Sequence, residues 1–228
     1  VIEPEYKDGK QRVKELTLHV GGSTPPSSSL TAAHLTVSDT DGTVLTEKPS
    51  LPKALSLFSR LNDEGHDPFV TLDFGEDATV GQLHQLAQLL KTIDGEKGVR
   101  VEPPLQGQPY YKAFAPNEAY RTRENRFLQP WELRLEPSTN GTITAEATEI
   151  TETWTKGEPK PAISTEEHAI DSPATFVQLI TTRKPDVKVL LVYAPETLTY
   201  AELMAFVRPA QATHPIIHVY LERRDSTE

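Results

Sequence analysis

Seven histidines are the residues of this 228-residue chain best suited to bind a metal ion or to transfer protons near neutral pH. Metal sites built on histidine and cysteine place these residues at short, fixed spacings. His214 and His218 are four residues apart, but they fall on a predicted turn and strand, where that spacing does not bring them to one helical face. We therefore predict no metal site. The seven histidines are His19, His34, His66, His84, His168, His214 and His218.

Carboxylates in neighbouring positions are the other candidates for acid–base chemistry. Glu76 and Asp77 precede a predicted helix, where negative charge interacts favourably with the helix dipole. We assign Glu166, Glu167 and Glu222 to solvated surfaces, because a catalytic pair needs a pocket that the sequence does not display. The chain has no cysteine, no Gly-x-Ser-x-Gly, no Walker loop and no Gly-x-Gly-x-x-Gly. We predict no catalytic residue and no cofactor-binding residue.

Aromatic and basic residues alternate between positions 103 and 130, a composition that also occurs in strips that bind single-stranded nucleic acid. The formal net charge of −10 opposes that function, because a polyanion needs a basic surface. We expect these aromatic residues to cover apolar surface or to dock a protein, and the arginines to form salt bridges. The residues concerned are Tyr110, Tyr111, Phe114, Tyr120, Phe127, Lys112, Arg121, Arg123 and Arg126.

The residues before position 103 read as alternating strands and helices. Alternating apolar residues predict strands over 14–20, 68–74 and 97–103, and a hairpin over 33–47 that turns at Asp41-Gly42. Two helices are predicted, one after Ser50 and one from Thr79. Their apolar faces comprise Leu51, Ala54, Leu55, Phe58 and Leu61 in the first helix and Leu83, Leu86, Ala87 and Leu90 in the second.

The residues after position 130 repeat this order, beginning with a hairpin. It is expected over 131–147 and turns at Asn140-Gly141, which explains the glycosylation-like triplet that ends at Thr142. We match this hairpin to the one over 33–47. Residues 151–170 are then an insertion between the hairpin and the following helix.

Two helices and two strands complete the second copy. Ser172 followed by Pro173 predicts a helix start, and Pro209 should end or kink a second helix that begins at Thr199. The strands are predicted over 187–194 and 215–222. The apolar face of the second helix comprises Tyr200, Leu203, Met204 and Val207.

An offset of 120 positions aligns Thr79 with Thr199, and each threonine opens a predicted helix. Gln82 follows the first by three positions and Glu202 follows the second, so each pair forms a predicted capping box. The same order of strand, turn, cap, helix and closing strand occurs twice, which indicates an internal duplication.

We predict the α+β fold class, with two tandem two-layer domains, each a mixed β-sheet with two helices packed on one face. The connections over 69–102 and 188–221 should be right-handed crossovers between parallel strands. The first domain is assigned to residues 1–102 and the second to residues 131–228. The Pro-, Tyr- and Arg-rich linker over 103–130 should lie against one or both domains.

The run of strand, acidic turn, threonine and helix resembles the periplasmic domain of ExbD and TolR, the biopolymer-transport proteins. That family has an acid near the end of a strand and a Tyr-Gly pair at the start of the last helix. The matching residues are Asp73 and Val80-Gly81 in the first copy and Tyr200-Ala201 in the second. Each copy keeps one member of the Tyr-Gly pair.

The resemblance covers residues 33–102 and 131–222, and it implies a membrane-anchored partner of a proton-driven motor. Family members have one N-terminal membrane helix, whose Asp takes part in proton flow through an ExbB- or TolQ-like channel protein. Their periplasmic domain dimerises and contacts other envelope proteins. The sequence begins at Val1 and contains no run long enough to span a bilayer, so we expect such a helix upstream of it. Two copies in one chain suggest that the chain mimics a dimer.

We therefore expect a non-catalytic periplasmic protein that is anchored to the inner membrane and binds a channel protein and other envelope proteins, with a homodimer as one possible state. Nucleic acid, metals and cofactors are not expected. The alternative is a small-ligand-binding or enzymatic protein with a site between the two domains, and a structural scaffold is a third reading. The strands over 14–20 or 215–222 are expected to be edges that accept a partner's strand.

Overall fold

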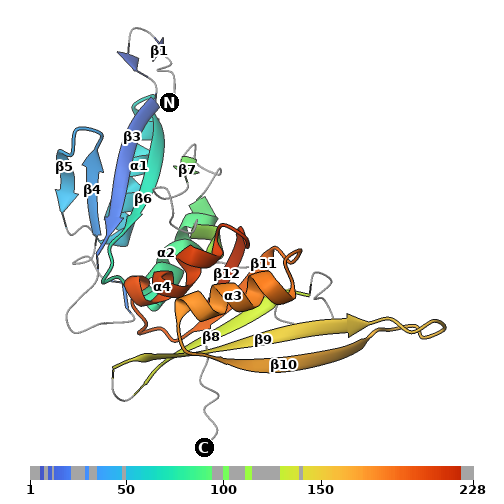
Figure 1. Cartoon of the computed structure of the whole chain (residues 1–228). Helices are drawn as coiled ribbons and strands as arrows, with labels where there is room; N and C mark the ends of the chain where they lie inside the picture. Colours follow the sequence, from blue (N-terminus) through green and yellow to red (C-terminus); the bar gives the residue numbers. More distant parts are fainter. Residues whose placement is uncertain are drawn as a thin grey trace, which may run out of the picture.

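The computed structural model describes residues 6–7, 10–11, 13–21, 29–30, 35–47, 50–93, 100–102, 111–114, 129–138 and 141–221. These residues form four α-helices and two five-stranded mixed sheets (Figure 1). Strands β1 (Tyr6–Lys7) and β2 (Lys10–Gln11) form a separate small ribbon. The predicted α+β class in two sheet-based units is confirmed.

The first half of the chain contains one sheet, with strand order β5-β4-β3-β6-β7. Strands β5, β4 and β3 are antiparallel neighbours, whereas β6 and β7 continue the sheet in parallel to β3. The elements are β3 (Val13–Val20), β4 (Leu35–Asp39), β5 (Val44–Glu47), α1 (Leu51–Asp63), β6 (Asp67–Phe74), α2 (Val80–Ile93) and β7 (Arg100–Glu102).

The second half has the same topology, with strand order β10-β9-β8-β11-β12 and the same sequence of antiparallel and parallel pairs. The two halves are therefore two copies of one topology, as the repeated pattern predicts. The elements are β8 (Trp131–Pro137), β9 (Ile143–Thr153), β10 (Ala162–Ile170), α3 (Pro173–Arg183), β11 (Val189–Ala194), α4 (Tyr200–Ala210) and β12 (Ile216–Leu221). The 3₁₀ turn η2 (Tyr111–Ala113) lies between the halves in sequence.

The predicted match between the two hairpins is wrong. The turn at Gly42 joins β4 to β5, whereas the turn at Gly141 joins β8 to β9, which correspond to β3 and β4. Both glycines have the positive φ that their turns require, 79° and 80°. A glycine turn shows where the chain reverses, but it does not show which pair of strands the turn connects.

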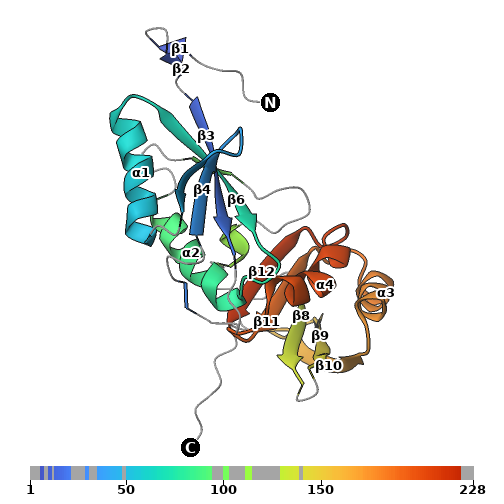
Figure 2. The ribbon, with the colours of Figure 1, turned by 90° about the vertical axis from the view of Figure 1, so that its left-hand side faces the viewer.

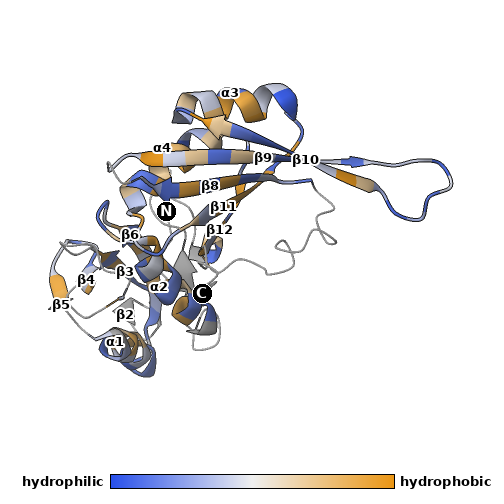
Figure 3. Cartoon of the chain, turned by 90° about the horizontal axis from the view of Figure 1, so that it is seen from below, coloured by the Kyte–Doolittle hydropathy of each residue, from blue (hydrophilic) through white to orange (hydrophobic). Residues whose placement is uncertain are grey.

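The predicted insertion over 151–170 is also wrong, because most of it is strand. Residues up to Thr153 belong to β9, and β10 pairs with β9 in antiparallel register as the counterpart of β5. The two strands run on past the sheet as a two-stranded arm (Figure 3). Trp154 at its end is 67% exposed and Ile163 is 41% exposed, so this arm carries apolar surface into solvent.

Of the two strands predicted to be sheet edges, only the second, β12, is an edge strand. Strand β3 lies between β4 and β6, so the prediction that residues 14–20 form a free edge is wrong. Strand β12 is the edge of the second sheet, but α2 and η2 pack against it. Among the described residues, no helix is long and apolar enough to cross a bilayer.

One apolar core runs through both halves. It includes the inward face of β6, at Val70, Leu72 and Phe74, and the face of α4 predicted from sequence. Phe114, which follows η2, is fully buried in the same core, as expected for an aromatic residue of the predicted linker. Helices α2 and α4 lie where the two halves meet (Figure 2). Because the core is continuous, the halves are parts of one packed body.

Candidate functional site

The starts of α2 and α4 meet at a junction formed by residues 75–81 and 195–201. Thr79 and Thr199, the two predicted caps, form an antiparallel bridge with each other. Four backbone hydrogen bonds cross the junction in two reciprocal pairs. They run from Val80 N–H to Leu198 O (2.8 Å), from Tyr200 N–H to Ala78 O (2.6 Å), from Gly81 N–H to Glu196 O (2.9 Å) and from Ala201 N–H to Glu76 O (2.9 Å).

The same offset of 120 positions that relates the two threonines converts each of these bonds into its partner. The two halves therefore contact each other about a pseudo-two-fold axis, in the way that the subunits of a two-fold symmetric dimer use one patch twice. Here both copies of the patch belong to one chain.

The capping boxes satisfy the remaining backbone N–H groups at the two helix starts. The Thr79 N–H donates to Gln82 Oε1 at 3.0 Å, and the Gln82 N–H donates to Thr79 Oγ1 at 3.3 Å. Thr199 and Glu202 make the same two bonds at 2.8 and 3.3 Å. A helix leaves its first four N–H groups without helical partners. At both helices the box satisfies two of them and the opposite half satisfies the other two, so neither helix start is left open for an anion.

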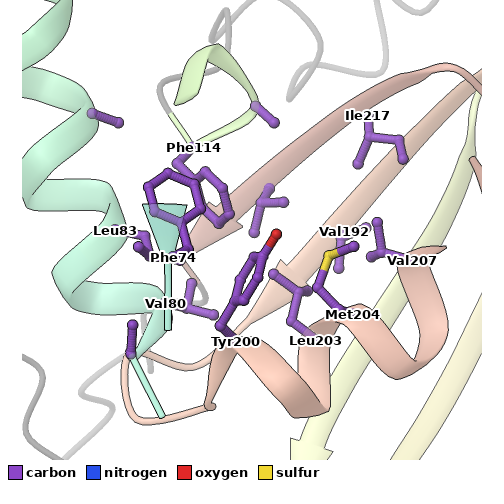
Figure 4. Close-up of a cluster of buried hydrophobic side chains, with 14 of the residues drawn as sticks. Phe74, Val80, Leu83, Phe114, Val192, Tyr200, Leu203, Met204, Val207 and Ile217 are labelled. Atoms are coloured by element: carbon purple, nitrogen blue, oxygen red, sulfur yellow. The ribbon is translucent and has the colours of Figure 1, made fainter. Parts of the chain in front are cut away.

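Aromatic rings fill the apolar side of the junction (Figure 4). The Phe74 ring packs edge-on against Tyr200 and Phe114, with ring centroids 5.5 and 5.8 Å apart. Tyr200 is only 2% exposed, and its hydroxyl has no hydrogen-bond partner among the described residues. Burial raises the pKa of the Tyr200 phenol above its ordinary value, so the group is neutral at any physiological pH.

His84 links the two halves through α2 and β12. The centroid of its ring lies 6.0 Å from that of Phe114, and the imidazole forms a hydrogen bond with the backbone of Val219. Burial lowers the pKa of His84 to about 4, against the smaller opposing effect of the Val219 bond. The imidazole is therefore neutral at pH 7 and has a structural role between the halves.

Other histidines lie apart from the junction's backbone contacts. His19 Nδ1 is 2.8 Å from Asp73 Oδ2, and both side chains are partly exposed at the carboxyl ends of β3 and β6. His214 is fully buried beside Thr213, and burial lowers the pKa of both His214 and His218. His66 lies just before β6, in a hollow beside the β4–β5 turn, and His34 is outside the described residues.

A cluster of two acids and a histidine was missed by sequence reasoning. Glu149 and Glu166 are directly opposite each other on β9 and β10, and His168 Nε2 lies 3.7 Å from Glu149 and 3.8 Å from Glu166. Like charges in opposite positions repel. Arg183 of α3 resolves this repulsion, because its guanidinium contacts each carboxylate at 2.7 Å. With that cation in place the cluster is an ion-pair network. The sequence does not reveal this pairing, because the polar run over 151–170 predicts an insertion and not a strand.

The other candidate residues from the sequence are exposed or lie outside the described residues. Glu76 and Asp77 are exposed in the turn before α2, where the Glu76 carbonyl takes part in the junction, and Glu167 is exposed on β10. Lys112 is exposed on η2. The candidates that lie outside the described residues are Tyr110, Tyr120, Arg121, Arg123, Arg126, Phe127, Asn140 and Glu222.

A groove of about 340 Å³ runs along the outer side of α4, beside the junction. We call it the α4 groove. Its floor includes the buried residues Phe74 and Met204, and its exposed lining is formed by Glu76, Ala201, Ala205, Arg208 and Pro209. The groove draws residues from both halves, so it is the place where a site between the halves, the alternative prediction, would lie.

Comparison of the chain with protein-family models, with curated proteins and with solved structures finds no match. The structural relationship that informs function is therefore the one between the two halves of the chain itself.

Proposed function

We propose that the chain is a non-catalytic binding and assembly protein, the periplasmic part of an ExbD/TolR-like component of a proton-driven envelope transport system. Two copies of one domain are fused as a built-in dimer. The observation that carries the proposal is the reciprocal set of backbone bonds that joins equivalent turns of the two halves. Its partners are an ExbB/TolQ-like channel protein and other envelope proteins, and the full-length protein is anchored to the inner membrane.

The positions that carry the family resemblance support this assignment. Val80-Gly81 and Tyr200-Ala201 match the family's Tyr-Gly pair, and they are also the residues whose N–H groups cross the junction. In a domain that works as a dimer, such a residue pair has two roles: it begins a helix and it joins the two copies. Both roles restrict which residues can occupy these positions. The junction has its backbone donors satisfied and its apolar groups buried, which suits assembly better than turnover of a substrate.

Photo-crosslinking of the full-length protein in its own cells tests this proposal. A photoreactive phenylalanine replaces Trp154 on the exposed arm or Ile216 on β12, which are 67% and 43% exposed. The expected result is a covalent adduct with an integral membrane channel protein from at least one of these positions. The matched control places the same residue at the fully buried Leu72, where no adduct should form. Adducts with cytoplasmic proteins alone would reject the proposal.

A second function is favoured by one observation, the α4 groove between the halves. A small anionic ligand bound there would contact the exposed guanidinium of Arg208. A thermal-shift screen of nucleotides, sugars and organic acids tests this reading. A stabilising compound whose effect disappears in Arg208→Ala would support it, and a screen without such a compound would leave the assembly function.

A further inference from the structure

The outer sides of α2 and α4 differ in how much of them is covered. Gly81 and Gln82 near the start of α2 are buried, and Gln82 is 0% exposed. The equivalent residues of α4, Ala201 and Glu202, are exposed and partly exposed. The two helices have the same place in the same topology, so the difference comes from what lies on them.

A short segment of the first half lies on α2. The Leu30 N–H donates to Gln85 Oε1 at 2.9 Å, and Gln82 Nε2 donates to the Ser29 carbonyl at 3.4 Å. The Leu30 side chain packs against the common core. Residues 29–30 belong to the long connection between β3 and β4, so this connection makes backbone contacts with the outer side of the helix and packs an apolar side chain against the core.

The second half has no connection of that length. Strands β8 and β9 are joined by a tight turn closed by the bonds from Ser138 N–H to Thr142 O (2.7 Å) and from Gly141 N–H to Ser138 O (3.0 Å). A turn this short has no residues to lay along α4. Ala205 occupies the position equivalent to Gln85; both residues are exposed, but Gln85 accepts the Leu30 N–H whereas Ala205 lines the α4 groove.

We propose that the α4 groove binds an extended segment of a partner protein, in the way that residues 29–30 bind to α2. The segment places one apolar side chain over Met204 and Ala205 and carries an acidic side chain that pairs with the exposed Arg208. The internal segment argues for a peptide as the occupant, because the same chain already shows how this surface of the helix is covered. The inference rests on the proposed function for the class of partner, a protein.

Selection from a phage-displayed library of random heptapeptides against the whole chain tests this inference. Selected sequences should combine an apolar residue with a nearby acid. One selected peptide is then synthesised with a fluorescent label, and its affinity is measured by fluorescence anisotropy. Ala205→Trp, which fills the groove, and Arg208→Glu, which reverses its charge, should each weaken binding at least about tenfold, as loss of a central contact does. The matched control is Ala162→Trp, at an exposed position of β10 that does not line the α4 groove. This variant should bind the peptide with unchanged affinity.

Both groove substitutions are at exposed positions, and circular dichroism confirms that each variant folds. If Ala205→Trp does not fold, Arg208→Glu carries the test alone. Selection without enrichment, or a peptide whose affinity is the same in the folded groove variants, would overturn the inference. Groove-dependent peptide binding supports it even where the full-length protein yields no channel adduct, and that combination would reject the transport assignment alone.

Discussion

The two halves of the chain share a topology and the backbone contacts of the junction, but their outer strands and their connections differ. Near the pseudo-two-fold axis the caps, the turns and the four crossing bonds are equivalent pair by pair. By contrast, β5 has four residues and β10 has nine, and the long connection over residues 21–34, which places residues 29–30 on α2, corresponds to a tight turn. Contact between the copies constrains the backbone near the axis, and segments that do not take part in these bonds are free to diverge.

The side chains at the axis show a second kind of difference. Phe74, Val80 and His84 of the first half correspond to Ala194, Tyr200 and Met204 of the second. Phe74 packs against Tyr200, so the symmetry-related pair is the smaller Ala194 and Val80. A dimer of identical chains would have to place the large pair on both sides of the axis. A fused pair can fill one side with large rings and the other with small side chains.

The largest effect is expected from Phe74→Ala, which gives the first half the residue that the second half already has. The 4% exposed ring contacts Tyr200 and Phe114, so its removal leaves a cavity at the junction. Loss of a buried phenylalanine lowers the free energy of unfolding by about 3–5 kcal/mol. Urea denaturation followed by circular dichroism measures the change.

This variant also tests whether the halves are one cooperative unit. The unsubstituted chain should unfold in one transition because its core is continuous. Phe74→Ala should separate this into two transitions, one for each half. A matched control is Phe58→Ala, which removes a 1% exposed ring of α1 away from the junction and should lower stability without separating the halves. Equal separation in both variants would contradict the role assigned to Phe74.

The next effect concerns acid stability and compares His84 with its counterpart Met204. The pKa of His84 is about 4 in the folded protein and 6.5 in the unfolded chain. Between these values the unfolded chain binds a proton that the folded protein does not, so the free energy of unfolding falls as the pH falls from 6.5 towards 4. The loss is about 3 kcal/mol at about 1.4 kcal/mol per unit of pKa difference.

His84→Met should remove this part of the pH dependence, and urea denaturation at pH 7 and pH 4.5 measures it. His214 and His218 also have lowered pKa values, so some loss of stability in acid remains in the variant. Identical pH dependence in the variant and in the unsubstituted chain would show that His84 binds a proton in the folded state.

The sequence indicated most elements of this fold because their signals are local. Apolar periodicity and the caps at Thr79, Ser172 and Thr199 correctly located the helices, and the capping boxes have the predicted bonds. The pairing of the strands was harder to predict from the sequence. Most residues of β10 are exposed on both faces of the strand, and its sequence is correspondingly polar. It therefore lacks the alternation of apolar and polar residues that marks a half-buried strand.

The junction was not predictable as a site from local patterns. Its hydrogen bonds join backbone groups of residues 120 positions apart, and backbone groups carry no sequence signal. The matching offset did relate Thr79 to Thr199, but an offset shows equivalence and does not show contact. The α4 groove was equally hidden, because it depends on a short connection between β8 and β9 that leaves the outer side of α4 open among the described residues.

A smaller effect is expected from the two caps, taken singly and together. Thr79→Ala and Thr199→Ala each remove a side-chain acceptor from a helix start, which costs about 1 kcal/mol per cap. The two threonines pair with each other across the junction, so their effects should not add. A double-mutant cycle in urea measures the coupling. The same cycle with Ser172→Ala in place of Thr199→Ala is the control, and it should be additive because Ser172 caps α3 alone.

The smallest effect should be a gain in stability from Tyr200→Phe. The ring and its contact with Phe74 remain, whereas a buried hydroxyl without a partner among the described residues is removed. An unsatisfied buried polar group opposes folding, so its removal should raise the free energy of unfolding by about 1 kcal/mol. Tyr193→Phe is the matched control, because the Tyr193 hydroxyl lies 3.5 Å from Glu132 Oε1 and its loss should give no gain. A loss of stability in Tyr200→Phe would mean that the hydroxyl is paired in solution, and the junction would then contain a polar contact on the side of the axis that now holds its largest rings.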